Sequence, residues 1–224
     1  PATTPAIKVS SVQALGARIV LHGDSYDEAA AHGMALLQAE GRTLIHPYDD
    51  QDVIAGQGTV AMELLADHHG KLDAVFIPVG GGGLAAGMAT YLKALDPSIR
   101  VIAVEPDDAA CLKAALAANQ PVRLEHVGIF VDGCAVRQIG ALPFELLRTR
   151  VDEVITVDAD QVCAAIRDVF EDTRSIVEPA GALAVAGMKR WCTENPGSGR
   201  TLAAVLSGAN MNFDRLGYVS ERAS

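Results

Sequence analysis

The sequence predicts an α/β protein with a parallel sheet flanked by helices. Short apolar runs rich in Val and Ile alternate with amphipathic stretches along the chain, and this alternation is typical of βαβ units. Most of the runs are continuously apolar, as expected for strands that are buried on both faces. Half of the 224 residues are hydrophobic, which is enough apolar material for a sizeable core.

Six short apolar runs are expected to be strands. Two of the intervening helices begin with a capping box, Ser25 with Glu28 and Asp158 with Gln161, and Gly41 stands where the first of these helices should end. The expected strands are Arg18–Leu21, Thr43–His46, Ala74–Val79, Arg100–Val104, Glu153–Val157 and Thr201–Leu206.

The helix after Asp158 carries an apolar stripe that predicts its core-facing side. Pro179, preceded by Glu178, suits the first turn of a further helix that runs to Trp191. The stripe consists of Val162, Cys163, Ile166, Val169 and Phe170. Cys163 is therefore interpreted as a core residue rather than as a ligand.

The composition excludes several classes of protein. The chain has 18 Lys and Arg against 28 Asp and Glu, a formal net charge of −10, whereas a nucleic-acid surface needs clustered basic residues. No apolar run approaches the roughly 18 residues of a membrane span, and no targeting signal is visible. The cysteines contain no C-x-x-C pair and are interpreted as reduced core thiols of a cytoplasmic protein; they are Cys111, Cys134, Cys163 and Cys192.

The segment His46–Asp52 interrupts the alternation and is the best candidate for a crossover between domains. It contains three aspartates. We interpret them as a solvated acidic loop rather than as a cation site.

The strongest local motif is a strand, four glycines and a helix start. The strand Asp73–Val79 is followed by Gly80–Gly83 and then by the helical run Ala85–Leu95. Glycines leave the backbone N–H groups unhindered, and the helix start adds a positive dipole end, so the motif predicts a phosphate cradle.

A dinucleotide-binding interpretation of this motif stays open at this point. Gly81, Gly83 and Ala86 also satisfy G-x-G-x-x-A, and Glu105 ends the next strand, where an acidic residue would contact a ribose. A P-loop, a G-x-S-x-G nucleophile motif and an H-x-x-x-H zinc pair are all absent from the sequence.

A second polar group follows the last expected strand. Ser207 begins the sequence Ser-Gly-Ala-Asn directly after Leu206. Ligands of parallel sheets bind beyond the carboxyl ends of the strands, so Ser207 and the glycine loop can face one crevice. By itself, the segment also fits an ordinary turn.

Several segments together resemble the serine/threonine dehydratases of the type II pyridoxal-phosphate fold, the tryptophan synthase β-like fold. They are Val79–Gly87, Val104–Pro106, Val177–Ala182 and Leu206–Asn210. Three others resemble the biosynthetic threonine dehydratases (threonine ammonia-lyases) in particular: Val53–Gly58, Ala110–Ala115 and Asn212–Arg222. The resemblance extends over essentially the whole chain.

The resemblance implies a cofactor, a reaction and site residues. The cofactor is pyridoxal 5′-phosphate, and Ser207 hydrogen-bonds its pyridine nitrogen. The reaction is the dehydration and deamination of L-threonine to 2-oxobutyrate and ammonia, which leads into isoleucine synthesis; a homo-oligomer that binds a small amino acid is expected. The backbone amides that bind the phosphate are those of Gly80, Gly81, Gly82, Gly83 and Leu84.

The sequence departs from this family in one respect. Neither the Schiff-base lysine motif Ser-Phe-Lys-x-Arg-Gly-Ala nor the carboxylate loop Ser-Ala-Gly-Asn-His is present, and the five lysines have unrelated neighbours: Lys8, Lys71, Lys93, Lys113 and Lys189. We therefore expect a fragment, with residues 1–50 a remnant of the small domain and 51–224 the large cofactor-binding domain. The lysine region and the C-terminal regulatory domains would be missing, and no turnover of threonine is expected from this chain alone.

The resemblance also implies a cation site. Related enzymes bind a metal through a Glu and a carbonyl just past the equivalent strand, which here are Glu105 and Ala109. Cys111 stands where a third, carboxylate ligand is expected. Hard divalent cations prefer oxygen, so a monovalent cation or no ion is favoured over Mg²⁺.

Two alternatives to the threonine dehydratase stay open. One is a relative with another substrate, a catabolic serine/threonine dehydratase or a serine racemase. The other is a non-catalytic dinucleotide- or phosphate-binding module, for which tight NAD binding without a response to pyridoxal phosphate would be diagnostic.

Overall fold

A computed structural model of the chain describes residues 1–223, which form two compact units. The first unit consists of Pro1–Ile45 and Asn210–Tyr218, and the second of His46–Ala209 and the residues from Val219 on. The first unit contains α1 (Ala6–Ala14) and α2 (Tyr26–Glu40), and α10 (Arg215–Arg222) begins in it. The division at 1–50 and 51–224 stays a prediction.

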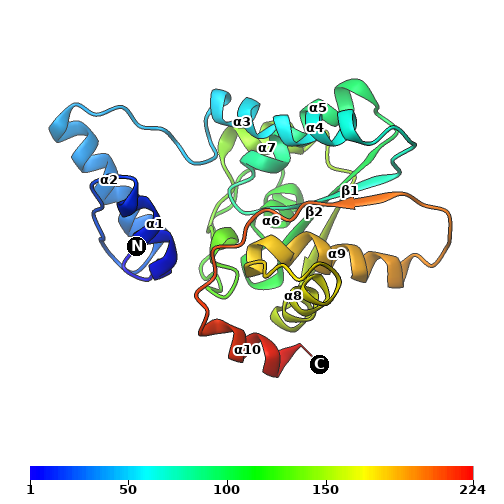
Figure 1. Cartoon of the computed structure of the whole chain (residues 1–224). Coiled ribbons are helices and arrows are strands. Elements are labelled where there is room, and N and C mark those ends of the chain that lie inside the picture. The colour runs from blue at the N-terminus through cyan, green and yellow to red at the C-terminus, as the bar shows by residue number, and fades with distance from the viewer. Residues whose placement is uncertain (224) are drawn as a thin grey trace. The chain divides into compact units, whose positions relative to one another are not determined.

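The second unit is built on a parallel four-stranded sheet (Figure 1). The strand order is β3-β2-β1-β4, so β1 is central and β4, the last strand in the chain, lies at its side. In register, Ala74 of β1 stands opposite Arg100 of β2 and Leu202 of β4. The strands are β1 (Ala74–Pro78), β2 (Arg100–Pro106), β3 (Glu153–Val157) and β4 (Leu202–Ala204). The predicted fold class, a parallel sheet flanked by helices, is confirmed.

Helices cover both faces of this sheet (Figure 1). One layer packs around α5 (Gly83–Leu95) and comprises α3 (Gln51–Gln57), α4 (Thr59–Asp67) and α7 (Ala141–Leu147). The other layer has α9 (Pro179–Glu194) directly on the strands and α8 (Ala159–Thr173) behind it. The connection from β2 consists of the short 3-10 helix η1 (Asp107–Ala109) and α6 (Cys111–Ala118), and η2 (Asp132–Cys134) lies in the loop before α7.

The core fills the space between the α5 layer and the sheet. Val75 and Ile77 of β1 and Val101 of β2 are fully buried, and they pack against Met88 and Leu92 of α5. Alternate side chains of the same strands face α9. There Gly187 lets the helix approach closely, because a Cβ at this position would overlap Val104.

Two predicted strands are wrong. Arg18–Leu21 and Thr43–His46 form no strand, although their sequence pattern is typical of strands. A strand forms only where a neighbour shares its backbone hydrogen bonds, and within the described residues the first unit offers these segments none. The other four strands are confirmed with small changes of bounds, and β4 keeps three residues of the predicted six.

The predicted helix starts and the predicted end of α2 are confirmed. The Ser25 hydroxyl accepts from Glu28 N–H at the start of α2, and Gly41 ends that helix with φ +64°. Asp158 and Gln161 form the reciprocal capping box of α8, and Pro179 opens α9.

Two burial predictions are wrong in detail. Phe170 of the α8 stripe is 44% exposed, although its neighbour Val169 is buried. Cys192 is exposed near the end of α9, whereas the other three cysteines are buried core thiols. Phe144 and Leu147 of α7 are buried in the core.

The acidic segment at the start of the second unit consists largely of helix caps. Both carboxylate oxygens of Asp49 accept from the first turn of α7, from Ala141 N–H and Leu142 N–H at 2.9 Å each. Asp50 is the N-cap of α3. The interpretation as a solvated loop is therefore wrong for these two residues, because each carboxylate neutralises unpaired N–H groups at a helix start.

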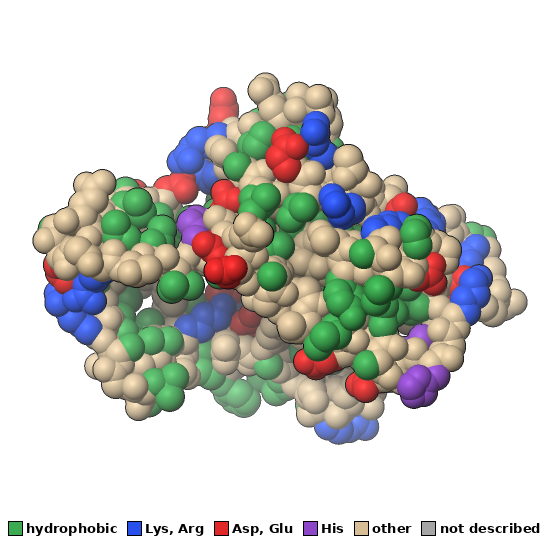
Figure 2. Space-filling model, turned by 90° about the horizontal axis from the view of Figure 1, so that it is seen from above, with side chains coloured by type: hydrophobic (Ala, Val, Ile, Leu, Met, Phe, Trp, Pro, Cys, Tyr) green, Lys and Arg blue, Asp and Glu red, His purple; other side chains and the backbone are tan. Residues whose placement is uncertain are grey.

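Charges of both signs are mixed on the face shown in Figure 2, where basic side chains lie beside acidic ones. Among the described residues, no helix is long and apolar enough to cross a membrane.

Candidate functional site

The glycine loop lies at the carboxyl edge of the sheet, between β1 and α5. Gly81, Gly82 and Gly83 are buried, and Gly82 has φ +93°, a conformation that favours glycine. The Gly81 carbonyl accepts from Gly140 N–H at 3.1 Å, just before the helix that Asp49 caps. The loop is therefore held from α7 as well as from its own strand and helix.

The N–H groups of this loop form a cradle. Within the described chain, Gly81, Gly82, Gly83 and Leu84 donate no backbone hydrogen bond to a protein acceptor. Buried N–H groups are normally paired, and these four stand at the positive end of the 13-residue helix α5. Such a row of donors is suited to a bound anion, phosphate above all.

Ser207 reaches the same edge of the sheet from the neighbouring strand. All strands are parallel, so their carboxyl ends lie together, and β4 pairs directly with β1. The glycine loop follows β1 and Ser207 follows β4, so the sheet brings the two predicted elements side by side. The exposed Ser207 hydroxyl lies 3.2 Å from the Ala180 carbonyl, to which it donates.

Glu178 is a candidate site residue to which the sequence analysis assigned no role in ligand binding. It precedes α9 and is 9% exposed. Its N–H donates to the Gly208 carbonyl at 3.1 Å, and a Cβ on Gly208 would overlap its carboxylate. The sequence indicated only that Glu178 precedes a helix start; its burial, which is rare for an acidic residue, is seen in the structure alone.

Tyr48 is a second residue that sequence reasoning missed. A Cβ on Gly81 would overlap the Tyr48 ring, and a Cβ on Gly83 would lie 2.9 Å from the Tyr48 Cα. The His46 ring stands edge-on to this ring with the centroids 4.7 Å apart. Tyr48 therefore forms one wall of the glycine loop, which nothing in its sequence neighbourhood indicated.

Glu105 is fully buried at the end of β2. Its carboxylate oxygens accept from Leu112 N–H at 2.7 Å and Lys113 N–H at 2.9 Å, so it caps α6. Burial raises the pKa of Glu105 to about 7, although the two N–H donors oppose this. The buried Cys111 thiol lies beside it, and burial together with the Glu105 charge raises the pKa of this thiol far above its usual range.

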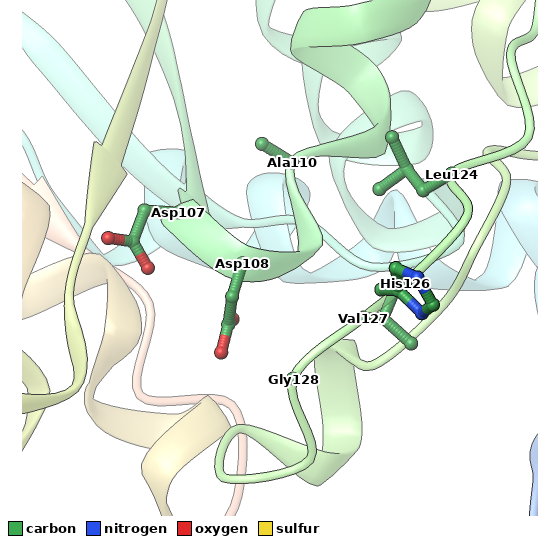
Figure 3. A pocket seen from close by; sticks show the side chains of 7 residues that line it. All are labelled: Asp107, Asp108, Ala110, Leu124, His126, Val127 and Gly128. Carbon is green, nitrogen blue, oxygen red and sulfur yellow. The ribbon is translucent and has the colours of Figure 1, made fainter.

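A separate hollow of about 470 Å³ follows β2 (Figure 3). Asp107 and Asp108 of η1 form one side, and the loop with His126 and Gly128 forms another. Partial burial and the neighbouring Asp107 raise the pKa of Asp108. The acidic lining disfavours an anion, so this hollow does not compete with the glycine loop for a phosphate.

Comparison with known proteins places this geometry in a family. The sequence profile of the family described as "Pyridoxal-phosphate dependent enzyme" matches residues 1–208. The chain belongs to the pyridoxal-phosphate-dependent enzymes. The predicted family is thereby confirmed.

Individual relatives agree with the family assignment. The chain is 53% identical to the "L-threonine dehydratase biosynthetic IlvA" of Escherichia coli, a match that covers 99% of this chain and 43% of that protein. The processed threonine deaminase isoform 2 of Solanum lycopersicum superposes with a TM-score of 0.95 at 41% identity, covering 100% of this chain and 65% of that one. Serine racemase of Dictyostelium discoideum gives 0.82 at 29% identity, covering 95% and 68%. The chain spans less than half the length of the curated relatives it matches.

The residues at the carboxyl edge fit pyridoxal phosphate. Four unpartnered N–H donors suit its phosphate, and a serine hydroxyl one strand away suits a ring heteroatom. The assignments of Gly80–Gly83, Leu84 and Ser207 stay predictions at the level of single residues.

In this structure Glu105 is not free to act as the acidic residue of a dinucleotide site. A ribose would need a carboxylate that faces the ligand, but both oxygens of Glu105 are occupied by the start of α6. The cation site at Glu105 and Ala109 stays a prediction. Among the described residues, no group of three or more His, Cys, Asp or Glu side chains is arranged to hold a metal ion.

The contact between Tyr48 and the loop gives a first testable expectation. Gly81→Ala should weaken the binding of pyridoxal phosphate at least tenfold, because the new methyl group forces the Tyr48 ring and the loop apart. The double variant Gly81→Ala/Tyr48→Ala should recover most of this affinity, as measured by calorimetric titration. An equal loss in both backgrounds would show that the Gly81 backbone, not the ring, is responsible.

Proposed function

We propose that this chain is the cofactor-phosphate-binding part of a threonine dehydratase, which converts L-threonine to 2-oxobutyrate and ammonia. One observation carries the proposal: unpartnered glycine N–H groups and Ser207 lie on adjacent strands of one sheet edge, in a chain that matches named biosynthetic threonine dehydratases along its whole length. Isoleucine synthesis, a homo-oligomeric state and a cytoplasmic location belong to the same proposal.

The glycine loop would hold the cofactor phosphate in this function. Its donors are fixed by β1, α5 and the bond to Gly140, so little ordering is needed on binding and affinity is retained. The N-terminus of α5 adds a favourable interaction with the phosphate charge. The loop would thus orient the cofactor from its phosphate end.

Ser207 would set the electronic state of the ring from the other end. When bound, pyridoxal phosphate supplies an electron sink for the amino-acid substrate. A hydroxyl, unlike a carboxylate, does not stabilise a protonated pyridine nitrogen. A weaker sink favours prompt loss of the β-hydroxyl group, as a dehydratase requires.

Of the four lysines in the second unit, Lys113 is exposed on α6 and the other three form ion pairs. Lys71 pairs with Asp73 before β1, and Lys93 with Asp152 before β3, both at the opposite edge. Lys189 pairs with Asp168 of α8. We therefore keep the proposal that the lysine that carries the cofactor is supplied from outside this chain.

A chimera tests the proposed function. The matching 43% of the Escherichia coli enzyme would be replaced by this chain, and 2-oxobutyrate release from L-threonine and pyruvate release from L-serine would be measured. We expect threonine turnover within about tenfold of the parent enzyme. The variant Ser207→Ala in the chimera should reduce turnover at least tenfold, since it removes the ring contact.

Other results would favour the alternatives. Turnover of serine with none of threonine would indicate a catabolic dehydratase, and racemisation of serine a racemase. A chain that binds NAD tightly and does not respond to pyridoxal phosphate would overturn the proposal in favour of a non-catalytic module. The isolated chain is expected to release no 2-oxobutyrate.

A further inference from the structure

Cys111 connects the buried Glu105 to the glycine loop. The Cys111 thiol is fully buried at the start of α6 and donates to the Gly80 carbonyl at 3.3 Å. The Glu105 carboxylate lies beside the thiol. Glu105 itself caps α6 through Leu112 N–H and Lys113 N–H, so the thiol lies between this cap and the first glycine of the loop.

Gly80 also lies close to η2. A Cβ at this position would lie 3.0 Å from the Cys134 Cα and 3.2 Å from the Gly133 carbonyl oxygen. The backbone of η2 therefore lies close to Gly80. The thiol and the backbone of η2 together hold the peptide group that follows Gly80.

The orientation of this peptide group decides where the next N–H points. The peptide bond between Gly80 and Gly81 is trans, and in a trans peptide the C=O and N–H bonds point in opposite directions. Because the Gly80 carbonyl faces Cys111, the Gly81 N–H faces away from α6. Gly81 is one of the residues whose N–H has no protein acceptor in the described chain.

We propose that Cys111 is a positioning residue that aims the Gly81 N–H at the phosphate, and that the thiol's bond to Gly80, together with the Glu105 cap of α6, holds the loop without a bound cation. The inference rests on the proposed function, since it takes this loop to be the phosphate site. A thiol is a weak hydrogen-bond donor and a poor ligand for hard cations, which prefer oxygen.

The first experiment compares the wild type with Cys111→Ala and Cys111→Ser. Calorimetric titration with inorganic phosphate and with pyridoxal phosphate should show about fivefold to tenfold weaker binding for Cys111→Ala, as expected for one lost hydrogen bond. Cys111→Ser keeps a donor and should bind within about twofold of the wild type. The matched control is Cys163→Ala in α8, also fully buried, which should lose stability but not phosphate affinity.

A second readout needs no ligand. The amide ¹H and ¹⁵N resonances of Gly81 should shift in Cys111→Ala and return toward the wild-type position in Cys111→Ser. Unchanged Gly81 resonances or unchanged affinities in Cys111→Ala would overturn the positioning role. A wild type that binds neither probe, with Gly81 resonances that do shift, would instead contradict the phosphate site and thus the proposed function.

The cation part is tested by exchange of salts at constant ionic strength. Phosphate affinity of the wild type should agree within about twofold in K⁺, Na⁺ and Mg²⁺ and with a chelator present. Cys111→Asp adds a carboxylate beside Glu105 and should make the melting temperature rise on addition of Mg²⁺, whereas Cys163→Asp should not respond. A wild-type affinity that depends on K⁺ or Mg²⁺ would overturn this part.

Discussion

Raising the pH from about 4.5 to 7 is expected to lower the free energy of unfolding by about 3 kcal/mol through Glu105 alone. Burial raises the pKa of this carboxyl from 4.5 to about 7. The folded chain therefore holds the Glu105 proton more tightly than the unfolded chain, which binds fewer protons in this pH range. Stability then falls as the pH rises through the range and is constant above it.

Urea unfolding of the wild type and of Glu105→Gln between pH 4 and 8 measures this effect. The difference between the two stability profiles should change by about 3 kcal/mol across the range, because Gln does not titrate. Glu145→Gln, at an exposed ion pair with Arg148, is the control and should leave the slope unchanged. Parallel profiles for the wild type and Glu105→Gln would contradict the assignment.

Replacing Trp191 by alanine is expected to cost about 3 to 5 kcal/mol of stability. The ring is 4% exposed and stands edge-on to Phe76 of β1 with the centroids 5.8 Å apart. Its N–H donates to Glu153 at 3.1 Å, and the guanidinium groups of Arg100 and Arg200 lie over it at 5.6 and 5.0 Å. The variant loses all of these contacts and leaves a cavity.

Trp191→Phe separates the apolar contribution from the polar one. It keeps a ring against Phe76 but loses the hydrogen bond to Glu153, so its cost should be about 1 to 2 kcal/mol. Both variants act at the amino edge of the sheet, where Arg100 and Glu153 begin their strands. Phosphate affinity of the folded variants should therefore equal that of the wild type, and a loss of affinity at unchanged fold would disprove the separation of the two edges.

The sequence predicted the strands of the second unit far better than it predicted the structure of the first. Continuous apolar runs predicted β1, β2 and β3 almost to the residue, because a buried parallel strand has little freedom in composition. The predicted strands Arg18–Leu21 and Thr43–His46 failed because pairing partners are not encoded in a short run. Local pattern predicts what a segment prefers, and the tertiary environment decides whether it pairs.

The residues of the candidate site were likewise predicted only in part. Glycines 80 to 83 were predicted from the motif, since a loop that presents N–H groups must lack side chains. Tyr48 lies 33 positions before Gly81 and contacts it through the fold alone. Asp49 was taken as solvated because its partners, the N–H groups at the start of α7, are 92 and 93 residues away.

The position of β4 has a consequence for the order of folding. β1, the glycine loop, α5 and β2 are contiguous, and the more distant residues that hold the loop, Cys111 and Gly140, also precede β4 in the chain. β4 joins β1 only after a segment of more than a hundred residues is closed, as the bond from Thr201 N–H to Asp73 across 128 positions shows. Closing long loops slows pairing. A nascent chain should therefore be able to capture a phosphate before Ser207 arrives, and the ligand could then template the docking of the last strand.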